Sequence, residues 1–120
     1  MFTTRAARIA DLDSILDLLP RLAEYELPDR REPEMFWRDD AKLVERWAAG
    51  QAQDSHIRVG VDENDRPVAT GIITIRPDMF SGERCAHLEV IVVSPVADGK
   101  GLGRTLIDEL QALARDLGAS

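Results

Sequence analysis

The sequence predicts a single α/β domain, of the α+β type, in which helices flank a mixed, mainly antiparallel sheet. Three observations indicate this fold. The chain has 120 residues, which suits one domain with one core. Two alternating segments around a polar turn, 56–62 and 68–75, are typical of a β-hairpin. A buried strand, 88–93, leads through a glycine-rich turn into an amphipathic helix. The predicted order is β-α-α-β-β-β-α.

The first half of the chain supplies the first strand and two helices. A strand is predicted over residues 2–9, where β-branched residues open the sequence. Asp11 suits the N-cap of the helix that follows, and Pro20 should kink or split that helix. A second helix is predicted over residues 36–49, and Gly50 ends it.

The second half contains the central strand and the last helix. Residues 88–93 form an apolar run interrupted by Glu89, which is typical of a strand covered on both faces. The helix begins near Gly101 or Leu102. Its apolar positions recur at helical spacing and form one face, made of Leu102, Leu106, Leu110, Leu113 and Leu117.

The turn before this helix predicts an anion site. A helix start leaves about four N–H groups without partners and carries partial positive charge. Gly99, Gly101 and Gly103 let an anionic group approach the main chain, and Lys100 adds a mobile charge. The turn is no P-loop, because Gly101 stands where Ser or Thr belongs. It is no G-x-G-x-x-G fingerprint, because that pattern fails from either Gly99 or Gly101.

Two short motifs lie in this turn: Val93-Ser94-Pro95, and then Asp98-Gly99-Lys100-Gly101-Leu102-Gly103. Together they resemble the acetyl-CoA-binding segment of the GNAT superfamily of N-acetyltransferases. That family places V-x-P and then R/Q-x-x-G-x-G/A between a strand and a helix. Asp98 departs from the pattern, so its carboxylate either points away from the diphosphate or weakens the pocket. A weaker similarity at Arg5, Ala7, Asp11 and Ile15 extends the resemblance over the whole chain.

The resemblance implies acetyl-CoA as the co-substrate. It implies that the main chain of Ile91, Val92 and Val93 binds the pantetheine arm like an added strand. The residues expected at the diphosphate are Asp98, Gly99, Lys100, Gly101, Leu102, Gly103 and Arg104.

Glu89 is the predicted catalytic base. A primary amine with a pKa of about 10.4 is protonated at pH 7 and must lose a proton before it attacks a thioester. Glu89 lies in an apolar run, where burial makes a carboxylate a stronger base, and it matches the strand position of a glutamate base in many GNAT members. The competing interpretation is that Glu89 pairs with an arginine or faces a solvated groove. His87, on the same face, is better explained as a solvated histidine, and Cys85 as a packed thiol.

The predicted reaction is acetyl transfer from acetyl-CoA to a primary amine of a small molecule or peptide. The loop 27–35, with Asp29, Glu32 and Glu34, is where the family shapes its acceptor site. The family often protonates the leaving thiolate with a tyrosine from a later helix, whereas Tyr25, the only tyrosine here, precedes that region. Alternatives are a non-catalytic acyl-CoA-binding or regulatory domain and an inactive structural fragment.

Residues 1–120 are expected to be one domain that lacks the C-terminal strands of the family, because the sequence stops after the last predicted helix. Self-association as a homodimer, or strand exchange, would cover the resulting open sheet edge, and the alternative is that the chain is a fragment of a longer protein. A net charge of -7 argues against nucleic acid as a partner. No apolar run reaches the ~18 residues of a membrane span, so no membrane association and a cytoplasmic location are expected. No residue spacing suggests a metal site.

Overall fold

The structure, a computed structural model, describes residues 1–24 and 37–119. Its centre is a four-stranded sheet in the order β1-β2-β3-β4, and every neighbouring pair is antiparallel. The strands are β1 (Thr3–Ala6), β2 (Ser55–Val61), β3 (Pro67–Pro77) and β4 (Arg84–Val93). The predicted, mainly antiparallel sheet is therefore confirmed.

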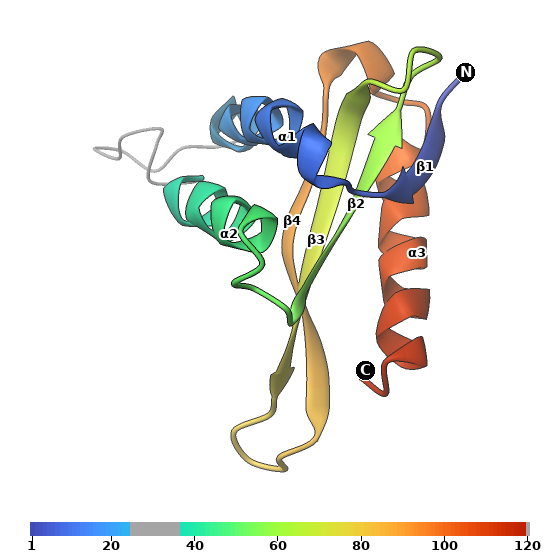
Figure 1. The fold of residues 1–120 in the computed structure, drawn as a ribbon. Coiled ribbons are helices and arrows are strands. Elements are labelled where there is room, and N and C mark those ends of the chain that lie inside the picture. The colour runs from blue at the N-terminus through green and yellow to red at the C-terminus, as the bar shows by residue number, and fades with distance from the viewer. Residues whose placement is uncertain (25–36, 120) are drawn as a thin grey trace.

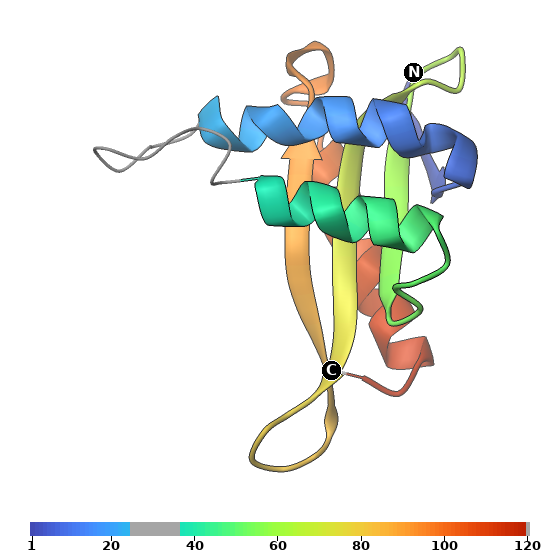
Figure 2. The ribbon, with the colours of Figure 1, turned by 60° about the vertical axis from the view of Figure 1, so that its left-hand side comes forward.

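Helices cover both faces of the sheet (Figure 1 and Figure 2). One face carries α1 and α2, and the other carries α3. Short 3₁₀ segments adjoin these helices: η1 and η2 flank α1, and η4 lies between β4 and α3. The bounds are η1 (Ile9–Asp11), α1 (Leu12–Leu18), η2 (Leu19–Glu24), α2 (Arg38–Ala48), η4 (Pro95–Ala97) and α3 (Leu102–Asp116). The predicted order β-α-α-β-β-β-α is confirmed.

The first strand is shorter than predicted because Asp11 turns the chain earlier. Its carboxylate accepts hydrogen bonds from both terminal nitrogens of Arg5, at 2.7 and 3.0 Å, and from the Arg8 main-chain N–H at 2.8 Å. Asp11 occupies the predicted N-cap position of α1. Its side chain makes no hydrogen bond to the first amides of that helix, so the expected capping bond is absent. The hydrogen bond from Arg5 holds the pKa of the Asp11 carboxyl below its usual value.

The predicted break at Pro20 is confirmed. The α-helix ends at Leu18 and the chain continues as the 3₁₀ segment η2 from Leu19. A proline cannot donate the main-chain hydrogen bond that would continue an α-helix, and 3₁₀ geometry is a frequent way to end one. The segment η2 contacts β4, so the break directs the residues after Pro20 toward the end of that strand.

Two apolar layers lie on the two faces of the sheet. The layer under α1 and α2 includes Ile15, Val44, Val59, Ile72 and Val92, with both tryptophans packed against it. The layer under α3 is formed by buried Leu102, Leu106, Leu110 and Ala114 at steps of four. The other predicted members of that helical face, Leu113 and Leu117, are only half-buried.

Glycines in β2 and β3 allow α3 to approach the sheet closely. A Cβ atom at Gly60 would lie 2.6 Å from a methyl carbon of Leu102 and 2.8 Å from its Cγ. A Cβ atom at Gly71 would lie 2.8 Å from a methyl carbon of Leu110. Both leucines are buried, so neither side chain can move aside freely.

The predicted acceptor loop, including Asp29, Glu32 and Glu34, and also Tyr25, lie outside the described residues. Within the described ranges, no helix has the length and apolar character that a membrane span requires.

We expect Gly60→Ala to lower the free energy of unfolding by about 1–3 kcal/mol, because the added methyl overlaps several atoms of Leu102 at once. Urea unfolding of the two proteins measures this difference. Gly71→Ala is the matched comparison, since only the far end of Leu110 is in the way, and it should cost less. A Gly60→Ala protein as stable as the parent would contradict the close packing described here.

Candidate functional site

A β-bulge in β4 sets the position of Glu89. Ile72 of β3 is opposite Val90, whereas the next residue, Ile73, is opposite Leu88. Glu89 is therefore the extra residue of the bulge. Bulges redirect side chains and are frequent beside active sites. Here the bulge places Glu89 next to Val90 on the face that carries α2, where Glu89 lines a cavity.

The outer edge of β4 presents main-chain groups beside the same segment. β4 is the last strand in the described sheet, so no described strand pairs with its outer edge. The Ser94 N–H donates to the Val68 carbonyl, and hydrogen-bonded pairs alternate in an antiparallel ladder. Val92 therefore directs its main chain to β3, while Ile91 and Val93 direct theirs outward.

The start of α3 has amides without intrahelical acceptors near the end of β4. Gly99 and Gly101 both have φ of 75°, a left-handed conformation that favours glycine. Gly101 is the N-cap and provides no side chain, and its carbonyl accepts from the Thr105 N–H. The helix geometry leaves the N–H groups of residues 102–104 without intrahelical acceptors. A Cβ at Gly103 would lie 3.4 Å from Val93, so this end of α3 touches β4.

Asp98 is held by an arginine that the sequence analysis did not name. The Nη2 atom of Arg21, in η2, lies 2.6 Å from Asp98 Oδ2, and its Nε atom donates to the Val93 carbonyl at 2.5 Å. The two outcomes predicted for Asp98 are a carboxylate that points away from the diphosphate and one that weakens the pocket, and neither includes the partner that the structure shows. No local sequence signal could have identified Arg21, because it precedes Asp98 by 77 residues.

The structure places the two predicted cationic side chains of the turn beside other groups. Arg104 is 82% exposed and bonds to Asp108, one helical turn along, at 3.3 Å. Lys100 lines a cavity of about 590 Å³ beside β1, together with Phe2 and Thr4. This end of α3 offers an anion its first main-chain N–H groups, and Arg104 adds an exposed positive charge in the first turn.

Glu89 lines a cavity of about 430 Å³ between α2, β3 and β4. Its Oε1 atom accepts a hydrogen bond from Nη2 of Arg76, and its side chain is 20% exposed. The structure thus shows the arginine partner that the sequence analysis gave as the competing interpretation. The other polar groups that line this cavity include Asp39, Asp40, Arg46, Asp54 and Thr74.

Asp40 is a second carboxylate in this cavity that the sequence analysis missed. Burial, with smaller contributions from the negative charges of Glu89 and Asp39, raises the pKa of Asp40 to about 6. The available signal was its helical spacing, since Asp40 precedes Val44 by four residues and Trp47 by seven and so shares their inward face. Asp40 and Glu89 are therefore two of the carboxylates that line this cavity, and burial raises the pKa of Asp40 toward neutral pH.

The remaining candidates contribute little to the cavity. His87 is exposed and pairs in register with Thr74. Cys85 is half-buried, and its thiol points to the Glu83 carbonyl at 3.8 Å. Neither residue lines the cavity that contains Glu89.

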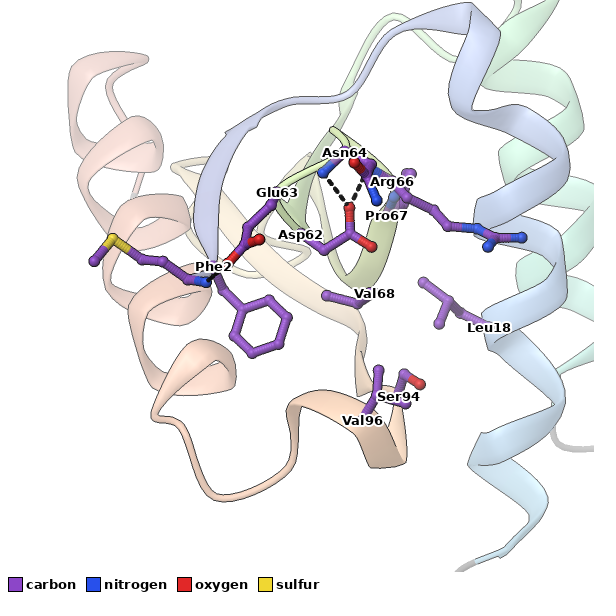
Figure 3. Close-up of a pocket in the computed structure, with 11 residues that line it drawn as sticks. Phe2, Leu18, Asp62, Glu63, Asn64, Arg66, Pro67, Val68, Ser94 and Val96 are labelled. Carbon is purple, nitrogen blue, oxygen red and sulfur yellow. Dashed lines mark hydrogen bonds and ion pairs between the residues drawn. The ribbon is translucent and has the colours of Figure 1, made fainter.

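A separate cavity of about 560 Å³ lies at the opposite end of the sheet. Figure 3 shows that its lining comes from the β2–β3 turn, the end of α1 and η4, including Phe2, Leu18, Val68 and Val96. Its lining includes none of the residues predicted to bind coenzyme or to act as the base. We therefore place the candidate site at β4 and not in this cavity.

The comparison with known families agrees with this geometry. Residues 12–120 match the acetyltransferase (GNAT) family. The chain belongs to the GNAT family of acetyltransferases. Membership implies acetyl-CoA as co-substrate and an amine as acceptor. No curated protein sequence matches this GNAT domain.

Solved structures share the fold of the GNAT domain. An acetyltransferase from Trypanosoma brucei is 26% identical, with a TM-score of 0.70, over 99% of this chain and 78% of that one. Glucosamine-6-phosphate N-acetyltransferase from Arabidopsis thaliana is 23% identical, with a TM-score of 0.69 and the same two coverages, 99% and 78%. A Pyrococcus furiosus protein is 18% identical, with a TM-score of 0.77, over 100% and 78%. For the last two structures, which are less than 25% identical to this chain, the similarity shows the fold alone.

We expect Asp40→Asn to stabilise the GNAT domain above pH 6. The folded pKa of about 6 exceeds the unfolded value of about 3.9, so charging Asp40 costs stability as pH rises between them. After allowance for solvent screening, the gain at pH 8 should be about 1 kcal/mol, and it should shrink toward pH 4. Thermal unfolding at both pH values measures it.

Asp17→Asn, on an exposed position of α1, is the control and should show no such pH-dependent gain. Equal effects of the two substitutions at pH 8 would contradict the assignment of a raised pKa to Asp40.

Proposed function

We propose that this GNAT domain transfers an acetyl group directly from acetyl-CoA to a primary amine of a small molecule or a peptide. The observation that carries the proposal is the arrangement along β4. Glu89 stands in the bulge beside a cavity, and four residues later the strand ends beside the start of α3, whose first amides have no intrahelical acceptors. That separation corresponds to about 13 Å of strand, so a coenzyme anchored at α3 has an extended edge to follow toward Glu89.

The proposed coenzyme site uses main-chain groups. The amides of residues 102–104, with Gly99 and Gly101 shaping the turn, would hold the diphosphate. The outward main-chain groups of Ile91 and the N–H of Val93 would bind the pantetheine arm as an added strand, while the Val93 carbonyl accepts a hydrogen bond from Arg21. Val92 fits this role less well, since its main chain is turned toward β3. Lys100 and Arg104 would contribute only charge at a distance.

The proposed acceptor site is the cavity of about 430 Å³ beside α2. Its carboxylates, Asp39, Asp40, Asp54 and Glu89, favour a cationic group such as an ammonium. Arg46 and Arg76 line the same cavity and keep its charge from being uniformly negative. An acceptor that carries both an ammonium and an acidic group would therefore find a partner for each.

Glu89 is the proposed base. Making a free amine from an ammonium with a pKa of about 10.4 costs about 4.6 kcal/mol at pH 7, and Glu89 would accept that proton, directly or through water. The nitrogen then attacks the thioester carbonyl carbon and the C–S bond breaks. The second surplus proton leaves the nitrogen as the amide forms, and the CoA thiolate takes it up. One proton is released overall, together with the acetylated amine and CoA.

We expect Glu89→Gln to lower kcat by about 10²–10⁴-fold while acetyl-CoA still binds, because the amide cannot accept the proton. Steady-state assays that follow free thiol with a set of primary amines measure the rate, and calorimetry measures binding. His87→Gln is the matched control on the same face of β4 and should change kcat by less than about threefold. The proposed base would be wrong if Glu89→Gln kept wild-type kcat across the pH range.

We also expect acetyl-CoA to stabilise the folded state. At a concentration of 100 times Kd the gain is about 2.7 kcal/mol, which a thermal-unfolding assay detects. ATP and NAD serve as controls, because they carry phosphates without a pantetheine arm. No shift with millimolar acetyl-CoA would overturn the proposal for this chain, whereas a shift without turnover of any amine would favour a coenzyme-binding domain that is not catalytic.

A further inference from the structure

Arg21 connects η2 with the end of β4 and with the β4–α3 turn, the segment of residues 94–101. It donates to the carbonyl of Val93, which precedes the turn, and to the carboxylate of Asp98 within it. Its side chain is 17% exposed, so the guanidinium is largely enclosed, whereas the Asp98 side chain is 56% exposed. Figure 2 shows the end of the α1–η2 segment lying across β4, beneath this turn.

The charge of Asp98 opposes the ligand proposed for this turn. A diphosphate at the start of α3 would be attracted by the first amides and repelled by a carboxylate three residues before Gly101. Arg21 places a cation directly on that carboxylate, with 2.6 Å between Nη2 and Oδ2. The pair has no net charge, so the field of the helix start can act on an anion.

We propose that Arg21 is a positioning residue for acetyl-CoA, which cancels the charge of Asp98 and holds it against η2. The inference rests on the proposed function, because it concerns the coenzyme site of that reaction. In this arrangement the positive charge near the proposed diphosphate site comes from Arg21 of η2, and not from an arginine at position 98 as in the family pattern. Coenzyme affinity should then depend on Arg21 only while Asp98 is present.

The geometry requires an arginine rather than any cation. The Nε and Nη2 atoms donate to two separate acceptors, one a main-chain carbonyl on the outer edge of β4 and the other a side chain in the turn. A guanidinium holds such donors in a fixed fork, whereas a lysine ammonium is a single point charge. Arg21→Lys should therefore keep part of the charge effect and lose the fixed orientation.

A double-mutant cycle tests the inference, with Arg21→Ala, Asp98→Asn and their combination. Calorimetry gives Kd for acetyl-CoA and for S-acetylpantetheine, which lacks the diphosphate. We expect Arg21→Ala to weaken acetyl-CoA about tenfold or more. We expect Asp98→Asn to stay within about threefold of wild type and the double variant to bind like Asp98→Asn. S-acetylpantetheine should bind all four proteins within about threefold.

Arg8→Ala is the matched control, because it also removes one positive charge and its pairing with Asp65 lies at the β2–β3 turn. It should leave Kd for acetyl-CoA unchanged. Should Arg21→Ala fail to fold, Arg21→Lys takes its place in the cycle, and it should weaken acetyl-CoA more in the wild-type background than in the Asp98→Asn background.

Two results would overturn the inference. One is an equal loss of acetyl-CoA affinity on removing Arg21 from the wild-type protein and from the Asp98→Asn variant. The other is an equal loss for acetyl-CoA and S-acetylpantetheine, which would make Arg21 a support of β4 only. Wild-type protein that binds no acetyl-CoA would refute the proposed function and the inference together. Wild-type binding with an additive cycle would refute the inference alone.

Discussion

The close packing of α3 against the sheet is the constraint on which the rest of this structure depends. Gly60 and Gly71 leave room for Leu102 and Leu110, so the helix axis lies nearer the strands than side chains there would allow. Glu109 adds a polar attachment, because Thr4 of β1 and Arg58 of β2 both donate to its carboxylate. With the helix fixed along its length, its first turn is fixed beside the end of β4.

The two faces of β4 present side chains to two different environments. Its residues Ile91 and Val93 pack toward α3, while Glu89 and Val90 lie on the side of α2. In a regular strand, Glu89 would share a face with Ile91 and Val93. The bulge breaks this alternation and moves the carboxylate to the opposite face, where α2 supplies Asp40 and a cavity. One irregular residue thus separates the acidic side of the site from the side proposed to bind the diphosphate.

Sequence reasoning succeeded where the signal was local. The strand, glycine turn and helix of residues 88–116 follow from periodicity and spacing alone, and the break at Pro20 follows from the missing N–H. It failed where the deciding partner was distant. The hydrogen bonds of Asp11 depend on Arg5, and the charge compensation of Asp98 depends on Arg21. The face on which Glu89 lies depends on the register between β3 and β4. None of these pairings has a periodic signature, because each is decided by tertiary packing.

The pairing of Arg21 with Asp98 also limits how a family pattern can guide protein engineering. A designer who restores the common pattern would exchange Asp98 for arginine, and the change looks favourable when that position is considered alone. In this chain it would set two guanidinium groups against each other, one of them largely enclosed and already bonded to the Val93 carbonyl. Residues 21 and 98 should therefore be changed together. A consensus sequence that is chosen one position at a time would treat Asp98 as a defect, although its charge is compensated by Arg21.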